Sequence, residues 1–133
     1  NNKTLNKYVF NNIIENWGWF GQMEKVIKKS TIVVLPSYRE GLPKVLIKSL
    51  ATGRPIITTN VPGCKECVIN NKNGLLIKVK NTIALARAIK FLLLLDKKKL
   101  TKMSIEARKF AVKNFNVNSV VKKHINIYSK LTM

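Results

Sequence analysis

The sequence predicts an α/β protein in which helices cover both faces of a parallel sheet. Short apolar runs typical of buried strands alternate with longer segments of helical periodicity. Three such runs, at residues 31–35, 55–59 and 75–79, are separated by segments rich in turn residues. The chain has 133 residues, 46% of them hydrophobic, so one domain with a substantial core is expected.

The amino-terminal part is expected to alternate between helix and strand. Residues 1–12 are expected to be the end of a helix, residues 13–17 a strand, and residues 23–29 a short amphipathic helix. The first apolar run, residues 31–35, is the next strand. Three neighbouring aromatic side chains are expected to pack in the core: Trp17, Trp19 and Phe20.

The middle of the chain has clear helix boundaries. Pro43 is expected at the first position of a helix that ends near Thr52, and Gly53 follows that end. Proline at the start and glycine just past the end are the usual asymmetry of a helix. The next elements are a strand, a turn, a short helical stretch and a hairpin-like turn, at residues 55–59, 61–63, 64–69 and 70–74.

The carboxyl-terminal part predicts an edge strand followed by three helices. The strand is residues 75–79, and the helices cover residues 82–95, 97–114 and 119–131. Residues 92–95 are expected in the core. The face of the first helix that is expected to be buried comprises Ile83, Ala86, Ile89 and Leu93.

The loop after the first apolar run is the strongest candidate for a binding site. It carries Glu40 and Gly41 and leads into the helix that begins at Pro43. The amino end of a helix favours an anion, because its N–H donors are unpaired and its dipole is positive there. Ligands of open parallel sheets bind beyond the carboxyl ends of the strands. Gly18 and Gly63 are expected at that same edge.

The chain is strongly basic, with 25 Lys and Arg against 6 Asp and Glu and a formal net charge of +19. Such a surplus attracts polyanions, and an anionic membrane surface is one partner that it suggests. The alternative explanation is a compositional bias towards Lys, Asn and Ile. Nucleic acid is an unfavoured partner, because the basic residues are spread along the chain and do not cluster with aromatic residues.

Cys64 and Cys67 form a single C-x-x-C pair. A structural zinc site needs four ligands, and the only histidine, His124, is distant in sequence. Small buried thiols are therefore favoured over a metal or redox site, and no metal is expected. Reduced thiols fit a cytoplasmic protein.

Four ordered blocks carry a resemblance to a known family. They read PSYREGLPKVLIKS, GRPIITTNVPG, NGLLI and a helical tail, at residues 36–49, 53–63, 73–77 and from Ile83 onward. In this order they resemble the carboxyl-terminal half of retaining, nucleotide-sugar-dependent glycosyltransferases of the GT-B fold (glycosyl transferases group 1, family 4-like). The resemblance covers almost the whole chain. It implies a Rossmann-like donor-binding domain over residues 1–133 that is truncated at its amino end, either as a fragment of a longer protein or as a truncated gene product.

The resemblance also implies which residues bind the donor. Glu40 is expected to bind the transferred sugar, although an acid at this position could also serve as a helix cap. The amides of Gly41 and Leu42 are expected to meet the sugar or phosphate, Arg39 either meets phosphate or is solvated, and the loop of Gly18 lies beside the base. The expected donor-binding set is Glu40, Gly41, Leu42, Pro43, Lys48, Arg39 and Gly18.

Lys48 departs from the family pattern. Eight positions after Glu40 the family has a second glutamate, which accepts hydrogen bonds from the ribose diol of the nucleotide; this chain has Lys48. An ammonium group donates three hydrogen bonds and accepts none, so Lys48 does not reproduce that contact. Either Lys48 approaches a phosphate as a point charge, or the position has lost its role.

The resemblance implies transfer of a sugar from a nucleotide diphosphate sugar to a hydroxyl of a glycan or lipid-linked acceptor, with retention. No catalytic residue and no cofactor is assigned. The acceptor is expected to bind the amino-terminal half, so the chain alone is not expected to be active. Two alternatives stay open: a degenerate non-catalytic remnant, and a basic module for anionic surfaces. The expected location is the cytoplasm, with or without contact with the inner face of the membrane.

Overall fold

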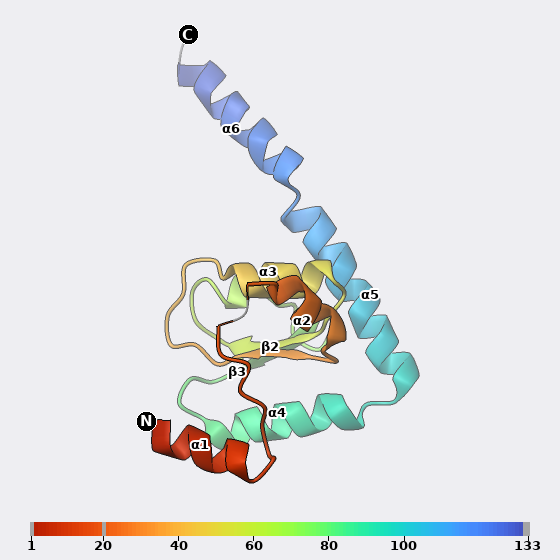
Figure 1. Ribbon diagram of the computed structural model, residues 1–133. Coiled ribbons are helices and arrows are strands. Elements are labelled where there is room, and N and C mark those ends of the chain that lie inside the picture. The colour runs from red at the N-terminus through yellow and green to blue at the C-terminus, as the bar shows by residue number, and fades with distance from the viewer. Residues whose placement is uncertain (1, 20, 132–133) are drawn as a thin grey trace.

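A three-stranded parallel sheet lies at the centre of the molecule (Figure 1). The computed structural model describes residues 2–19 and 21–131. The strands run in the order β1-β2-β3, which confirms the predicted α/β class and places β3 at an edge. The elements in chain order are α1 (Asn2–Phe10), α2 (Met23–Lys29), β1 (Val33–Leu35), α3 (Lys44–Ala51), β2 (Ile56–Thr59), the 3-10 helix η1 (Lys65–Cys67), β3 (Gly74–Ile77), α4 (Thr82–Leu94), α5 (Lys97–Asn114) and α6 (Val117–Leu131).

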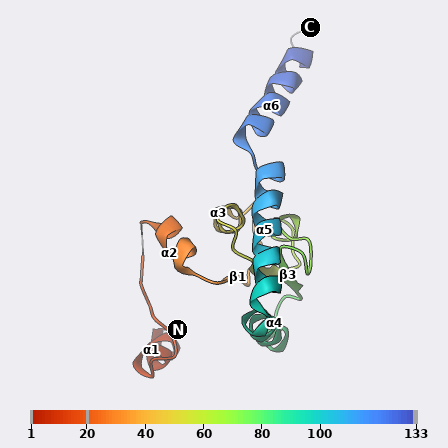
Figure 2. The same ribbon diagram turned by 90° about the vertical axis from the view of Figure 1, so that its right-hand side faces the viewer.

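Helices cover both faces of the sheet, as the sequence predicts (Figures 1 and 2). The central strand β2 sends alternate side chains to opposite faces, so Ile56 and Ile57 enter two different clusters. The cluster around Ile56 contains side chains of α3 and α5, including Leu46, Leu50, Ala107 and Ala111. The cluster around Ile57 contains side chains of β3, of α4 and of the start of α5, namely Leu75, Ile77, Ala88, Leu92 and Met103.

Helix α3 ends in a glycine turn that holds the start of β2. Gly53 has a left-handed φ of +67°, its amide donates to the Leu50 carbonyl (2.9 Å), and the Arg54 amide donates to the Ser49 carbonyl (2.8 Å). These two bonds are those of a Schellman motif. Pro43 was predicted as the first helical residue, but it is the N-cap of α3, so the helix begins one residue later, at Lys44. The Pro43 carbonyl accepts a hydrogen bond from the Leu46 amide (3.0 Å).

Side-chain caps fix the starts of α4 and α5. Asn81 Oδ1 accepts from the Ala84 amide (2.8 Å), and Asp96 Oδ1 accepts from the Lys99 amide (2.8 Å). The hydrogen bond from the Lys99 backbone holds the pKa of Asp96 below its usual value, so this cap stays ionised. Helix α5 spans the residues predicted for it.

Helix α4 does not bury the predicted face. Its fully buried residues are Ala88 and Leu92, whereas Ile83 and Leu93 are exposed. Leu94 was expected in the core and is 74% exposed. Apolar side chains occur on nearly every side of this helix, so periodicity alone does not show which stripe meets the sheet.

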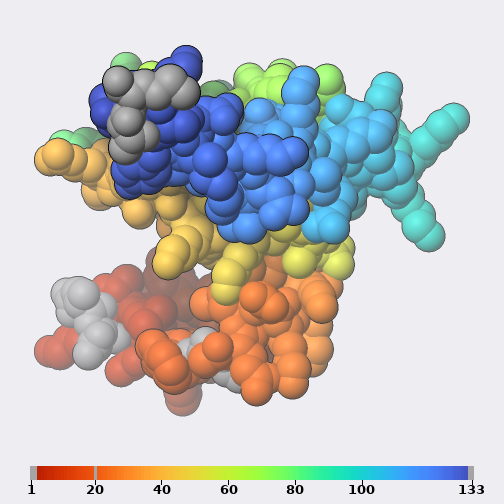
Figure 3. All heavy atoms as spheres, turned by 90° about the horizontal axis from the view of Figure 1, so that it is seen from above, coloured from red at the N-terminus to blue at the C-terminus, as the bar shows by residue number. Residues whose placement is uncertain are grey.

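The predicted strand at residues 13–17 is absent, and this segment is an extended loop. A strand needs neighbouring backbone, yet here the Ile13 amide bonds back to the Tyr8 carbonyl (3.0 Å), and no segment of the described residues pairs with it. Seen from above, the red and orange residues up to α2 project to one side of the body (Figure 3). The core packing predicted for Trp17 and Trp19 is wrong, because Trp19 is 93% exposed and Trp17 half exposed; Phe20 lies outside the described residues.

The remaining elements differ from prediction in detail. Only Lys65–Cys67 of the expected helical stretch is helical, and the turn after Asn70 leads into a strand parallel to β2, so it is not a hairpin. Helix α6 begins at Val117, has no buried residue and extends away from the sheet (Figure 1). Within the described ranges no helix is long and apolar enough to cross a membrane.

Candidate functional site at the carboxyl edge of the sheet

The loop after β1 is tied to the end of β2 by hydroxyl groups. Thr58 Oγ1 donates to the Leu35 carbonyl (2.8 Å), and the Thr59 hydroxyl donates to the Ser37 carbonyl. Both threonines are buried, so these hydrogen bonds are shielded from water. The bonds fix the direction in which residues 36–42 leave the sheet.

The same serine positions the carboxylate of Glu40. Ser37 Oγ donates to Glu40 Oε1 at 2.7 Å, and the Glu40 side chain is half-buried. Within the described residues Oε2 has no hydrogen-bond donor. One carboxylate oxygen is therefore held while the other is available to a hydroxyl group of a ligand.

The turn after β2 lies directly against the Glu40 loop. Gly63 has a left-handed φ of +86°, and a Cβ there would overlap the Gly41 carbonyl oxygen and lie 2.5 Å from the Glu40 carbonyl oxygen. Only glycine allows this approach of two backbones. A Cβ added at Gly41 would meet nothing within 4 Å, so the glycine that this close packing requires is Gly63.

The amino end of α3 presents unpaired donors at this loop. Its N-cap, Pro43, has no side chain that accepts a hydrogen bond. In the described part of the chain the amides of Lys44 and Val45 have no acceptor, as expected for the first turn of a helix. With the helix dipole, these amides favour an anion.

Five of the expected site residues are therefore brought together in one loop and helix start: Arg39, Glu40, Gly41, Leu42 and Pro43. Gly18 is not placed as predicted, because it follows an extended loop and not a strand; its φ is +59° and its amide bonds to Asn16 Oδ1 (3.0 Å). Lys48 lies in the last turn of α3, and its Nζ pairs with Glu24 Oε1 of α2 at 3.2 Å.

A shallow cavity of about 170 Å³ at this edge was not anticipated. Tyr38, Thr59, Lys78 and Lys80 are among its lining residues, so all three strand ends contribute. The rule that ligands bind past strand ends, applied also to β3, is the signal that points to Lys78 and Lys80.

Cys64 and Cys67 are buried, as expected for small thiols. Burial, with smaller contributions from Cys64 and Glu66, raises the pKa of the Cys67 thiol to about 11. Such a thiol stays protonated at neutral pH, which is unlike a reactive cysteine. Among the described residues no three His, Cys, Asp or Glu side chains are grouped as a metal site.

Known sequences share this pattern. Residues 11–110 match the family described as glycosyl transferases group 1. The chain is 30% identical over 107 residues to the N,N'-diacetylbacillosaminyl-diphospho-undecaprenol alpha-1,3-N-acetylgalactosaminyltransferase of Campylobacter jejuni, over 80% of this chain and 28% of that protein. It is 31% identical over 112 residues to the UDP-Gal:alpha-D-GlcNAc-diphosphoundecaprenol alpha-1,3-galactosyltransferase of Escherichia coli, over 84% of this chain and 28% of that protein.

A solved structure shares the fold. The structure of HepE from Anabaena in complex with UDP matches 97% of this chain and 35% of its own, with a TM-score of 0.88 and 18% identity. The three-stranded parallel sheet flanked by helices is that of GT-B glycosyltransferase domains. The chain spans less than a third of the length of these two curated relatives. With three quarters of its residues matched by the family model, the chain belongs to the glycosyl transferases group 1.

Proposed function

We propose that residues 1–133 form the donor-binding, carboxyl-terminal domain of a retaining glycosyltransferase. The reaction moves a sugar from a nucleotide diphosphate sugar to a hydroxyl of a glycan or lipid-linked acceptor. The names of the Campylobacter and Escherichia relatives, which describe transfer to diphospho-undecaprenol-linked sugars, support this class of reaction. The acceptor binds outside the donor site described here, and the proposed location is the cytoplasm, with or without contact with the inner face of the membrane.

The observation that carries the proposal is the held carboxylate of Glu40. Ser37 and the backbone contact with Gly63 fix Glu40 beside the amino end of α3. A nucleotide sugar has a polyhydroxylated ring next to a diphosphate, and this site offers an acceptor next to anion-binding amides. The sugar therefore lies on Glu40, and its phosphate lies on the amides of Gly41, Leu42 and the first turn of α3.

The neighbouring residues take secondary roles in this proposal. Arg39 is exposed beside Glu40 and binds the diphosphate. Stabilising the negative charge that develops on the leaving diphosphate is the main electrostatic requirement of such a transfer. Lys48 is the specific observation that favours the second candidate, a degenerate non-catalytic remnant, because Lys48 pairs with Glu24 and cannot accept a hydrogen bond from a ribose.

Paired titrations of one variant test the proposal. Glu40→Gln keeps the size of the side chain and removes its charge. The affinities for UDP-glucose and for UDP are measured by calorimetry in the original chain and in the variant. The affinity for UDP-glucose relative to that for UDP is expected to fall at least about tenfold in the variant, because a charge-assisted hydrogen bond to the sugar is weakened. The control is Glu66→Gln, an equal change of charge at an exposed residue of η1. An unchanged ratio in Glu40→Gln contradicts the role assigned to Glu40.

A further inference from the structure

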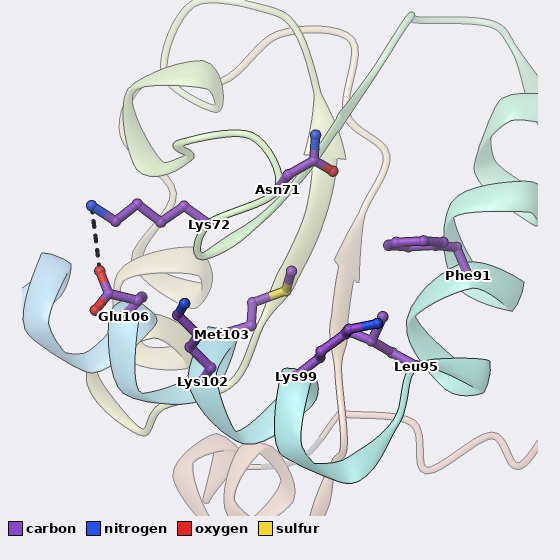
Figure 4. Close-up of a pocket in the computed structure, with 8 residues that line it drawn as sticks. All are labelled: Asn71, Lys72, Phe91, Leu95, Lys99, Lys102, Met103 and Glu106. Carbon is purple, nitrogen blue, oxygen red and sulfur yellow. Dashed lines mark ion pairs between the residues drawn. The ribbon is translucent and has the colours of Figure 1, made fainter.

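A second and larger cavity lies at the opposite edge of the sheet from Glu40. Its volume is about 560 Å³, and it opens between α4, α5 and the turn that precedes β3 (Figure 4). The turn contributes Asn71 and Lys72, which come just before the amino end of β3. Since Glu40 follows the carboxyl end of β1, and the strands are parallel, this cavity is separate from the proposed donor site.

The floor and one wall of this cavity are apolar. Phe91 lies in the last turn of α4, Leu95 is the C-cap of that helix, and Met103 faces them from α5 (Figure 4). Met103 is buried in the cluster around Ile57, whereas Phe91 is 50% exposed. An aromatic ring left half in water at a cavity mouth offers contact area to an apolar group of a ligand.

The rim is cationic. Lys99 and Lys102 lie one turn apart on α5, and Lys72 lies across from them. Among the described residues that line the cavity, Glu106 is the only acid. Three lysines against one glutamate leave a formal surplus of two positive charges. The Lys99 and Lys102 side chains project from the same helix as the Met103 side chain, so the cations flank the apolar floor (Figure 4).

The single acid of the lining is already neutralised. Glu106 pairs with Lys109 at 3.3 Å and with Lys72 at 3.4 Å. The hydrogen bond from Lys109, and secondarily Lys72, holds its pKa below the usual value. Lys99 pairs with Asp96 at 3.2 Å, whereas in the described part of the chain Lys102 makes no ion pair. Of the three lining lysines, Lys102 is therefore the one without an ion-pair partner among the described residues.

We propose that this cavity binds a phosphate ester of an apolar alcohol. The phosphate lies on Lys102 and Lys99, because ammonium groups bind phosphate as point charges, and the first carbons of the apolar chain lie on Phe91, Leu95 and Met103. A volume of about 560 Å³ is in the range of small-molecule sites. A bare polyanion leaves the apolar floor unused, and an uncharged alcohol leaves Lys102 without a counter-ion.

This ligand chemistry has two sources: a single-chain phosphate ester that is dissolved, and the head group of an anionic lipid in a membrane. The probe for the first is decyl phosphate below its micelle concentration, titrated calorimetrically into the 133-residue chain, with inorganic phosphate and decanol as comparators. The probe for the second is a set of phosphatidylcholine vesicles with and without phosphatidic acid. Both sources require the same residues.

The variants are Lys102→Gln and Phe91→Ala, which alter exposed side chains. Each is expected to weaken decyl phosphate binding at least about tenfold. The matched control is Lys122→Gln, which removes one charge from the exposed helix α6 and leaves binding unchanged. Melting curves of all three variants establish that they remain folded.

The outcomes separate the sources and decide the proposal. Weaker vesicle binding by Lys102→Gln and Phe91→Ala, but not Lys122→Gln, assigns the cavity to a lipid head group. Decyl phosphate binding that depends on these residues, with vesicle binding equal in all variants, assigns it to a dissolved ester. The proposal is overturned if decyl phosphate binds no better than inorganic phosphate, or if Lys102→Gln and Lys122→Gln lose affinity equally.

Discussion

Replacing Gly63 by alanine is expected to destabilise the protein and to disorganise the loop of Glu40. Two costs add at this position. The left-handed φ of +86° costs an alanine about 1–2 kcal/mol. The added Cβ also overlaps the Gly41 carbonyl oxygen and comes within 2.7 Å of the Gly41 carbonyl carbon. Both atoms belong to backbone, so no side chain can rotate away and the loop itself has to move.

The combined loss is expected to be about 3 kcal/mol or more in the free energy of unfolding. For a chain of this size that corresponds to a fall in melting temperature of about 10 °C. The assay is urea unfolding followed by circular dichroism, with the melting curve as a second readout. A displaced loop also moves Glu40 from Ser37, so UDP-glucose affinity is expected to fall in the protein that remains folded.

Gly41→Ala is the matched control on the facing backbone. An alanine Cβ at Gly41 meets nothing within 4 Å, and its φ is not left-handed. Its stability is therefore expected to stay within about 1 kcal/mol of the original chain. The reasoning is refuted if Gly63→Ala is as stable as Gly41→Ala, because the structure would then not contain this backbone contact.

Three further predictions concern Lys48, Cys67 and the isolated chain. A glutamate at position 48 would face Glu24, so Lys48→Glu is combined with Glu24→Lys. If the new carboxylate accepts hydrogen bonds from the ribose, the UDP affinity measured by calorimetry rises about tenfold or more. Equal or weaker binding by the double variant assigns Lys48 to the phosphates or to no role. Because the pKa of Cys67 is raised to about 11, alkylation of this thiol by iodoacetamide should be slow at pH 8 in the folded chain and should accelerate as the pH approaches 11. The unfolded chain should react readily at pH 8. Equal alkylation rates of the folded and unfolded chains at pH 8 would contradict a buried thiol. This chain alone should transfer no sugar, because catalysis needs groups from both sides of the cleft, and chain-dependent release of UDP in the presence of acceptor would contradict that.

Local sequence signals predicted much of the fold. The bounds of α2 and α5, the strand at the centre of the sheet and the glycine after α3 follow from periodicity and helix-end preferences, which act within a few residues. The strand predicted at residues 13–17 failed because a strand depends on a partner elsewhere in the chain. The buried face of α4 failed because its apolar side chains surround the helix, and only packing selects one stripe.

The sequence predicted some parts of the candidate site and missed others. Residues 39–43 are adjacent in sequence, so the motif alone placed them together. The Gly63 contact with Gly41, the Lys48 pair with Glu24 and the cavity beside Lys102 each join segments that are distant in sequence. Such contacts depend on how the layers pack, which periodicity does not specify.

Mapping nucleotide binding residue by residue tests the central claim most directly. The amide signals of the ¹⁵N-labelled chain are followed by NMR as UDP-glucose is added. The largest saturable shifts are expected at the amides of Glu40, Gly41 and Leu42, at the first turn of α3 and at Gly63, with little change at Lys102. Saturable shifts confined to other parts of the chain, or no saturable shifts, would contradict the assignment of a donor site to the carboxyl edge of the sheet.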